Sequence, residues 1–591
     1  MNRSWIFRRA PWLLTAWVLL LLLPGTATLP IVDRDEPRFA TATREMIQRS
    51  DWIVPTFNGN YRFDKPVLTY WLMRAGYGLF GIGEFGARVH AIGATIVLVL
   101  ATWWAGRKWF GERVGLLAAG MLASCMQVFI HGRLSLADMP MVACVVVACV
   151  ALIELLEAEA PRPFRNRWWW ALYLSLGFGF LAKGPIVAAV PVLALLLYRF
   201  AFWRKPLRWA HLGIAPGLLI ALAIIAAWGI PALVATHGLF WRVGMGEHVV
   251  QRGFEKFNGR GYTPFFYLGT APFSLFPWVA LLGFLPWIVR RTWSARTAWL
   301  LCWLIAPYVI FTAYATQLPH YVLPAFPALF LLLARALVVP WEERPRWATV
   351  LAWSLLGLFV VLFVGAAIGV QLADLPSEAL PLRVAFSGVC LVMLGFAAFS
   401  SAVMLGALGE EAPVASEGTA GGEAVRMRAG PSIVLLAGLV LLVPGAILMA
   451  RGLRETSLTV QTAGRFDALP AGTRFVGAGF SEPSLVFYTG RRWAFPQTAD
   501  ELAQALRKPG PLVVVSIDEE CDPLKLFAAG LGFAPRNSSK PLFRPGPAEW
   551  APQVAELSSS PEWTSSQLVG FNLGRTRWQH LRVWVRDAEI H

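Results

Sequence analysis

Runs of about 20 apolar residues recur along most of this chain, and they restrict it to a small set of folds. A helix of that length crosses the hydrocarbon core of a bilayer while its backbone polar groups are bonded internally. Only 15% of the 591 residues are charged, which is few for a water-soluble protein of this size. The sequence therefore predicts a mainly α-helical, polytopic membrane protein.

About 13 of these runs are expected to span the membrane by the length criterion. They lie near residues 11–30, 87–105, 114–131, 139–157, 168–182, 184–200, 211–235, 265–289, 297–316, 320–339, 347–371, 384–407 and 431–450. The first run could pass for a signal peptide, but a charged segment follows it at once and many spans come later. We interpret it as a retained first helix.

Positive charge is concentrated on alternate connections between the spans. Short basic connections remain in the cytoplasm, so the pattern predicts a cytoplasmic N-terminus and a C-terminus on the outer side. The basic connections are the N-terminal segment and residues 107–113, 162–167, 199–208, 290–296, 344–346 and 426–428. They explain the net charge of +16 without a nucleic-acid partner, and none is expected.

The composition changes near residue 452, and we divide the chain there. Residues 1–451 form the predicted transmembrane domain, with outer-face loops 31–86 and 236–264. Residues 452–591 form a predicted soluble α/β domain of ordinary size. Strands are expected at TRFVGAGF, PSLVFYTG and GPLVVVSI, and helices at TADELAQALRK and CDPLKLFAAGLG.

The first outer loop opens on DRDEPRFA, an unusually charged stretch where the chain leaves the membrane. A carboxylate such as Asp35 can act there as a base toward an acceptor group, and Arg38 can hold a phosphate. The same residues also fit a plain helix start, with an aspartate as the cap and Glu36 and Pro37 in the first turn. The stretch alone favours the helix start, and both interpretations are compatible.

Other ionisable residues stand at the outer ends of spans. Lys65 precedes Pro66 among aromatic residues, which suits a phosphate or cation–π contact as well as simple snorkelling. Asp138 starts a span and is equally a good helix cap. Lys183 lies between two apolar runs, where a charge is costly and therefore a functional candidate. Further polar residues of this kind are Arg133, Glu247, His248, Arg252, Glu255, Lys256, Gln317, His320 and Tyr321.

Nearly all of these residues fall on the same predicted side of the membrane. Together they predict a cation-rich outer site of Arg38, Lys65, Lys183 and Arg252, with acids nearby, that suits a phosphate-bearing lipid. No cysteine or histidine spacing typical of a metal site occurs. The sequence does not decide whether the protein binds a divalent metal, and Asp64 and His248 are the only candidates for its ligands.

Five motifs in this order resemble the ArnT-like family of 4-amino-4-deoxy-L-arabinose transferases, which belongs to the dolichyl-phosphate-mannose–protein mannosyltransferase (GT-C) superfamily. The motifs are DRDEPRFA, DWIVPTFNGNYRFDKPVLTYWL, LADMP, LAKGP and QLPHYVLPAFP, and the resemblance covers most of residues 1–330. It implies an inverting glycosyltransferase of the bacterial cytoplasmic membrane. Such an enzyme takes a sugar from a polyprenyl phosphate on the periplasmic face and transfers it to an acceptor such as lipid A of the lipopolysaccharide.

The resemblance also implies roles for single residues. Asp35 matches the catalytic aspartate, with Glu36 and Arg38 in the same motif. The residues matching the substrate-binding positions are Glu36, Arg38, Lys65, Asp138, Lys183, Arg252 and Tyr321. Asp64 stands where close relatives commonly have glutamate, and Gln317 where they commonly have lysine. The donor sugar and the acceptor, whether lipid A, a glycan or a protein, therefore stay open.

Two other classes of function are compatible with a membrane protein that binds a lipid phosphate. A flippase or transporter of lipid-linked sugars would be expected to show internal repeats and charges at the midplane, and neither is seen. A scaffold protein acting through residues 452–591 would leave the outer-loop residues unexplained. The residues therefore favour an enzyme.

Overall fold

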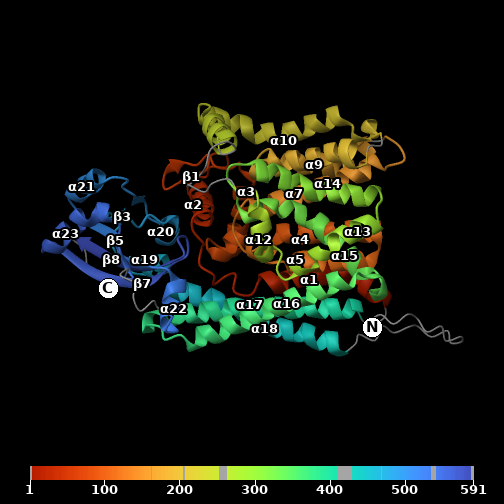
Figure 1. Ribbon diagram of the computed structural model, residues 1–591. Coiled ribbons are helices and arrows are strands. Elements are labelled where there is room, and N and C mark those ends of the chain that lie inside the picture. The colour runs from red at the N-terminus through yellow and green to blue at the C-terminus, as the bar shows by residue number, and fades with distance from the viewer. Residues whose placement is uncertain are drawn as a thin grey trace.

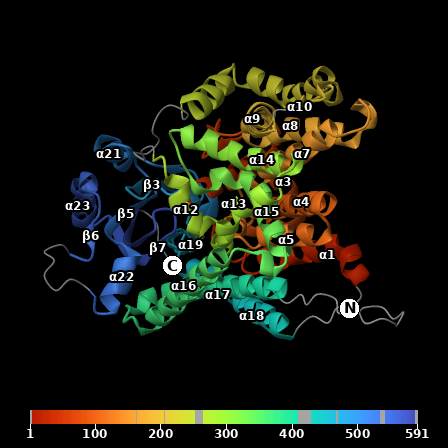
Figure 2. The same ribbon diagram turned by 45° about the vertical axis from the view of Figure 1, so that its right-hand side comes forward.

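A computed structural model describes residues 3–161, 163–203, 206–251, 263–408, 429–466, 469–533 and 541–586. Most of these residues form a bundle of long helices that run roughly side by side (Figure 1). A smaller domain of mixed strands and helices lies at one end of the bundle, and Figure 2 shows the same arrangement from a second direction. The predicted fold class is confirmed: this is a polytopic membrane protein with a small C-terminal α/β domain.

The helices of the bundle lie within or across the predicted apolar runs, and some runs contain more than one helix. Their bounds are α1 (Arg3–Leu22), α4 (Glu84–Phe110), α5 (Glu112–Ala123), α6 (Met126–His131), α7 (Asp138–Leu156), α8 (Arg167–Lys183), α9 (Ile186–Leu197), α10 (Ile214–Ala235), α12 (Phe266–Ser274), α13 (Leu285–Arg291), α14 (Ala295–Ala313), α15 (Phe326–Val338), α16 (Arg346–Leu372), α17 (Leu380–Leu408) and α18 (Ala429–Thr456). Among the described residues, eight helices are long and apolar enough to cross a membrane.

The expected count of about 13 spans is therefore not confirmed, because several apolar runs form shorter or broken helices. The run 114–131 is divided between α5 and α6 at Ser124 and Cys125. The run 265–289 is divided into α12, a 3₁₀ segment and α13, and Pro277 stands at the break. Proline lacks the N–H that continues a helix, and hydropathy alone does not reveal this.

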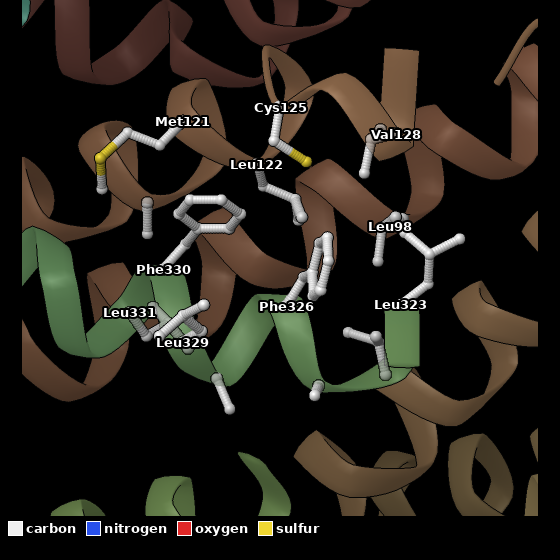
Figure 3. Close-up of a cluster of buried hydrophobic side chains, with 14 of the residues drawn as sticks. Leu98, Met121, Leu122, Cys125, Val128, Leu323, Phe326, Leu329, Phe330 and Leu331 are labelled. Carbon is white, nitrogen blue, oxygen red and sulfur yellow. The ribbon is translucent and has the colours of Figure 1, made fainter. Parts of the chain in front are cut away.

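Helix α15 lies in the centre of the bundle, and 83% of the apolar window that contains it is buried. Figure 3 shows Phe326 and Phe330 of this helix facing Met121, Leu122 and Cys125, which come from α5 and the start of α6. Apolar side chains of this kind pack in close contact, because the interior of a protein is as dense as an organic crystal. The buried helices thus form a rigid support for the segments at their outer ends.

The C-terminal domain is built on a mixed sheet of six strands. The strands are β3 (Arg474–Ala478), β4 (Trp493–Ala494), β5 (Leu512–Cys521), β6 (Arg544–Pro545), β7 (Trp563–Asn572) and β8 (Arg577–Arg586), in the order β4-β3-β5-β8-β7 with β6 beside β5. The predicted helices are confirmed as α21 (Ala499–Arg507) and α22 (Pro523–Gly530). Strands β7 and β8 were not predicted.

The strand expected at PSLVFYTG is wrong, because these residues form the short helix α20 (Pro483–Thr489). Pro483 occupies the first turn, where its fixed φ suits a helix and its missing N–H costs nothing. Gly490 then ends the helix in the left-handed region, with φ of 64°. The β-branched and aromatic residues between them suggested a strand, but the two ends decide the structure.

Candidate active site

The first outer loop contains helix α2 (Asp35–Gln48), which begins at Asp35. Asp35 points outward, with 69% of its side chain exposed, and its Oδ1 lies 3.8 Å from Nη1 of Arg38. The predicted helix start with Asp35 and Glu36 in its first turn is therefore confirmed, but the expected aspartate cap is wrong, because Arg34 stands at the N-cap and its side chain makes no capping bond. Residues three apart lie on the same face of the helix. This face presents a carboxylate and a guanidinium side by side at the rim of the bundle.

Glu36 lies on the opposite side of α2 and is buried, with 1% exposed. Its two carboxylate oxygens accept hydrogen bonds from Nε and Nη2 of Arg88 at 2.7 and 2.8 Å. The backbone N–H groups of Val32 and Ser135 donate to the same carboxylate at 2.7 and 2.8 Å. These bonds use the acceptor capacity of Glu36 within the chain, which supports a positioning role for it rather than direct contact with a substrate.

The rest of the loop forms a small hairpin, β1 (Thr56–Phe57) and β2 (Asn60–Tyr61), followed by helix α3 (Leu68–Phe80). The turn predicted at Asn58 and Gly59 is confirmed, and both residues have positive φ. Glu45 of α2 accepts from the N–H of Asn58 at 2.8 Å and the hydroxyl of Thr56 at 2.5 Å. The hairpin is therefore fixed to the helix that begins with Asp35.

A polar group follows the hairpin, and its central residue is Arg62, which the sequence analysis missed. Arg62 is buried, contacts Oδ2 of Asp64 at 2.7 Å and donates from Nε to the hydroxyl of Tyr70 at 3.0 Å. Lys65 is half-buried beside this group, and its Nζ donates to the carbonyl of Asp64 at 3.0 Å. The order of residues in RFDK gives no sign that the arginine, and not the lysine, pairs with the acid.

A second polar group lies at the neighbouring ends of α7 and α8. Asp138 is the first residue of α7, and Lys183 is the last residue of α8. Their side chains form an ion pair with each other, and both are largely buried. The ring of Tyr321 lies below the Lys183 ammonium, 5.2 Å from its Nζ to the ring centroid. The structure thus brings together three of the predicted site residues.

Two histidines extend this second group. Nε2 of His320 lies 3.6 Å from Oδ1 of Asp138, and the rings of His320 and His131 are 4.6 Å apart between centroids. His131 in turn lies 3.0 Å from Nε2 of Gln127 through its Nδ1. The sequence analysis did not single out His131, which ends an apolar run, although it stands close before Arg133 and Asp138 in the chain.

Both polar groups rest on one buried apolar cluster. Ala137 and Leu181, neighbours of Asp138 and Lys183, pack in the same cluster as Phe39 of α2 and Tyr70 of α3. Glu36 is also hydrogen-bonded to Ser135, three residues before Asp138. The exposed Asp35–Arg38 pair and the Lys183–Asp138 pair are therefore held by connected parts of the structure.

Some predicted residues cannot be placed in this arrangement. Arg252 lies outside the described residues, as do the side chains of His248 and Glu247. Gln317 accepts from the N–H of Thr263 at 3.1 Å and is buried. Within the ranges that the structure describes, no three His, Cys, Asp or Glu side chains come together as a metal site, and Asp64 is paired with Arg62.

Comparison with known proteins places the chain in a family. Residues 64–230 match the family described as dolichyl-phosphate-mannose-protein mannosyltransferase. A protein of Pectobacterium carotovorum named undecaprenyl phosphate-alpha-4-amino-4-deoxy-L-arabinose arabinosyl transferase is 30% identical over 413 residues, covering 68% of this chain and 72% of that protein. A protein of the same name from Aeromonas salmonicida is 33% identical over 381 residues, covering 62% and 67%.

The extent of the matches differs among relatives. The protein of this name from Erwinia tasmaniensis is 32% identical over 307 residues, so the match spans only 54% of that relative's length. Among solved structures, the apo form of ArnT from Cupriavidus metallidurans has a TM-score of 0.68 at 18% identity, covering 98% of both chains. The form bound to undecaprenyl phosphate has a TM-score of 0.67 at 20% identity, covering 92% of this chain and 97% of that one.

The two structural matches show that the fold extends through the C-terminal domain, while the sequence matches identify the family. These findings confirm the resemblance that the five motifs indicated. The chain belongs to the family of undecaprenyl phosphate-alpha-4-amino-4-deoxy-L-arabinose arabinosyl transferases, within the GT-C superfamily.

Proposed function

We propose that this chain is an inverting glycosyltransferase that moves 4-amino-4-deoxy-L-arabinose from undecaprenyl phosphate to lipid A. The observation that supports it most is that an exposed carboxylate and a buried cation are both present, each held by its own ion pair. Asp35 and Arg38 are accessible at the rim, and Lys183 is held nearby by Asp138. A base that is exposed to water suits the acceptor, and a cation at the end of a membrane helix suits the phosphate of a lipid donor.

The donor reaction breaks the bond between the sugar C1 and the phosphate oxygen. The electron pair leaves with the oxygen, so negative charge builds on undecaprenyl phosphate. Lys183 stabilises this charge, because an ammonium has three N–H donors and Asp138 uses only part of them. Asp138 orients the Lys183 ammonium through their ion pair.

The acceptor oxygen attacks C1 from the opposite side, which inverts its configuration. Asp35 accepts the proton when the attacking group carries one, and orients the group when it is a phosphate already ionised. Arg38 lies beside Asp35 and offers a forked set of donors to a phosphate, either of the donor or of lipid A. We assign Asp35 as the catalytic residue and Arg38, Lys65, Lys183 and Tyr321 as substrate-binding residues.

A direct assay tests this function. The purified protein is incubated with undecaprenyl-phosphate-linked 4-amino-4-deoxy-L-arabinose and lipid A, and the products are weighed by mass spectrometry. We expect lipid A that carries one added aminoarabinose, together with free undecaprenyl phosphate. Movement of the intact lipid-linked sugar across a vesicle bilayer without cleavage would instead support the flippase. Transfer to a glycan or protein but not to lipid A would support the proposed glycosyltransferase activity with a different acceptor.

We also propose that the N-terminus is cytoplasmic and that the active site and C-terminal domain are periplasmic, in the bacterial inner membrane. Cys521 is buried, so it does not serve as a label. In a variant without native cysteines, Ala555→Cys on the exposed face of α23 (Ala551–Ser559) is expected to react with a membrane-impermeant maleimide added outside the inner membrane. Glu159→Cys, exposed on a predicted inner connection, should react only after lysis, and the reverse pattern would overturn the orientation.

A further inference from the structure

The C-terminal domain contacts the loop that leads into Asp35, and these contacts suggest what the domain does. Residues 29–34 are the last part of the connection between α1 and α2 and stand directly before Asp35; we call them the entry segment. The entry segment makes hydrogen bonds both to the helix bundle and to helix α20 of the C-terminal domain. Because it forms no helix or strand, its backbone polar groups need partners from other elements.

The bundle holds the first half of the entry segment through one arginine. Arg88 of α4 is fully buried, and its guanidinium donates to the carbonyls of Leu29 at 2.5 Å and Pro30 at 2.8 Å. The same guanidinium pairs with Glu36, and Glu36 accepts from the N–H of Val32. The bundle therefore fixes the segment from one side.

Helix α20 holds the second half. The hydroxyl of Tyr488 accepts a hydrogen bond from the N–H of Ile31 at 2.8 Å. Asp33 accepts from the N–H of Ser484 at 2.9 Å and from its hydroxyl at 2.5 Å. These bonds anchor the backbone at Ile31 and the side chain at Asp33, two residues before Asp35.

The contact is reciprocal, because the first outer loop completes both ends of α20. Glu482, the residue before α20, makes no side-chain cap, and Asp33 instead accepts from an N–H in the first turn. At the other end, Arg44 of α2 donates to the carbonyls of Val486 at 2.8 Å and Phe487 at 2.7 Å. Those carbonyls are among the last in the helix and would otherwise lack partners.

Two more pairs reinforce this contact. Asn58 of the hairpin and the backbone of Trp493 exchange hydrogen bonds of 2.7 and 3.0 Å. Tyr488 and Arg454 both donate to Oε1 of Glu84, at 3.2 and 2.6 Å. Burial, together with the nearby carboxylates of Glu482 and Glu36, raises the pKa of Asp33 to about 7.

From this geometry we infer that the C-terminal domain positions the catalytic residue. Ser484 and Tyr488 of α20 hold Asp35 in the correct place relative to the donor phosphate. The inference rests on the proposed function, in which Asp35 acts on the acceptor. Among the residues assigned to the substrates, Lys183 and Tyr321 lie on elements that α20 does not hold by the bonds described above, and so does Asp138, which orients Lys183. Loosening α20 should therefore affect the chemical step and leave donor binding intact.

The test combines Ser484→Ala with Tyr488→Phe, which removes the two hydroxyl hydrogen bonds to the entry segment and leaves the side-chain shapes nearly unchanged. The bond from the Ser484 N–H to Asp33 is kept, and the bond from the Tyr488 hydroxyl to Glu84 is also lost. We expect kcat to fall about 10-fold or more, because small displacements of a catalytic group are costly, while KM for the lipid donor stays within about 2-fold. Ser558→Ala and Tyr173→Phe remove one hydroxyl bond each at remote positions and should keep the wild-type kcat.

Two further measurements separate this inference from the proposed function. Amide hydrogen exchange of residues 31–40 should become faster in the double variant and not in the controls, and this readout needs no turnover. Asp33→Asn retains an acceptor oxygen for Ser484, so it should keep more activity than Asp33→Ala. Unchanged exchange, or a loss of donor binding that matches the loss of kcat, would overturn the positioning role. Absence of any transfer by the wild-type protein would overturn the proposed function instead.

Discussion

Asp35→Asn is expected to lower sugar transfer by about 100-fold or more, the scale of general-base catalysis, while the protein still folds and binds undecaprenyl phosphate. Asparagine has the same shape, and α2 begins without a side-chain cap, so the helix should persist. The ion pair with Arg38 is largely exposed and contributes little to stability, so its loss should not unfold the loop. Steady-state transfer to lipid A by the purified variant measures the effect.

Asp33→Asn provides the matched control two residues upstream. Asp33 contacts the chain's own Ser484, and asparagine can still accept from the N–H of that residue. Its effect on transfer should therefore be much smaller than that of Asp35→Asn. If Asp35→Asn retains nearly full turnover, or if Asp33→Asn is the more damaging change, then Asp35 only starts a helix and the base lies elsewhere.

Lys183→Ala is expected to weaken binding of undecaprenyl phosphate by about 10- to 100-fold, which corresponds to roughly 1.5–3 kcal/mol for a hydrogen bond to a charged group. It should also destabilise the protein by about 3–5 kcal/mol, because Asp138 would be left as a buried carboxylate without its partner. Binding is measured by titration with the lipid in detergent, and stability by the midpoint of thermal unfolding.

A double variant separates the two effects of this substitution. Lys183→Met combined with Asp138→Asn removes both charges and keeps side chains of similar size, so thermal stability should largely return. The affinity for undecaprenyl phosphate should stay low, since the cation is still absent. Recovery of affinity together with stability would mean that Lys183 serves only to satisfy Asp138.

The sequence predicted the parts of this molecule that follow local rules. The apolar runs located the helices, and Lys183 and Asp138 stand at helix ends, as their places beside apolar runs predicted. The helix start at Asp35 could be inferred because caps and first-turn acids act within a few residues. The roles of these residues as catalytic and substrate-binding groups are still predictions.

What the sequence did not reveal depends on contacts between distant segments. Glu36 stood in the same motif as Asp35, and only the position of Arg88 on another helix shows that it faces inward. Arg62 had no local signal to distinguish it from Lys65 as the partner of Asp64. Helix α20 was assigned as a strand from residue preference, because a helix of this length depends on caps that another domain supplies.

The contact between Ile31 and Tyr488 joins residues that are 457 positions apart, which has a consequence for how the protein is made. A ribosome releases the entry segment long before α20. During that interval the membrane holds a nascent chain whose first helices are inserted but whose Asp35 is not yet fixed. Under our inference, such a chain would bind the lipid carrier without consuming it. Activity would therefore begin only when the domain that contains α20 has folded, so products truncated before α20 would be inactive.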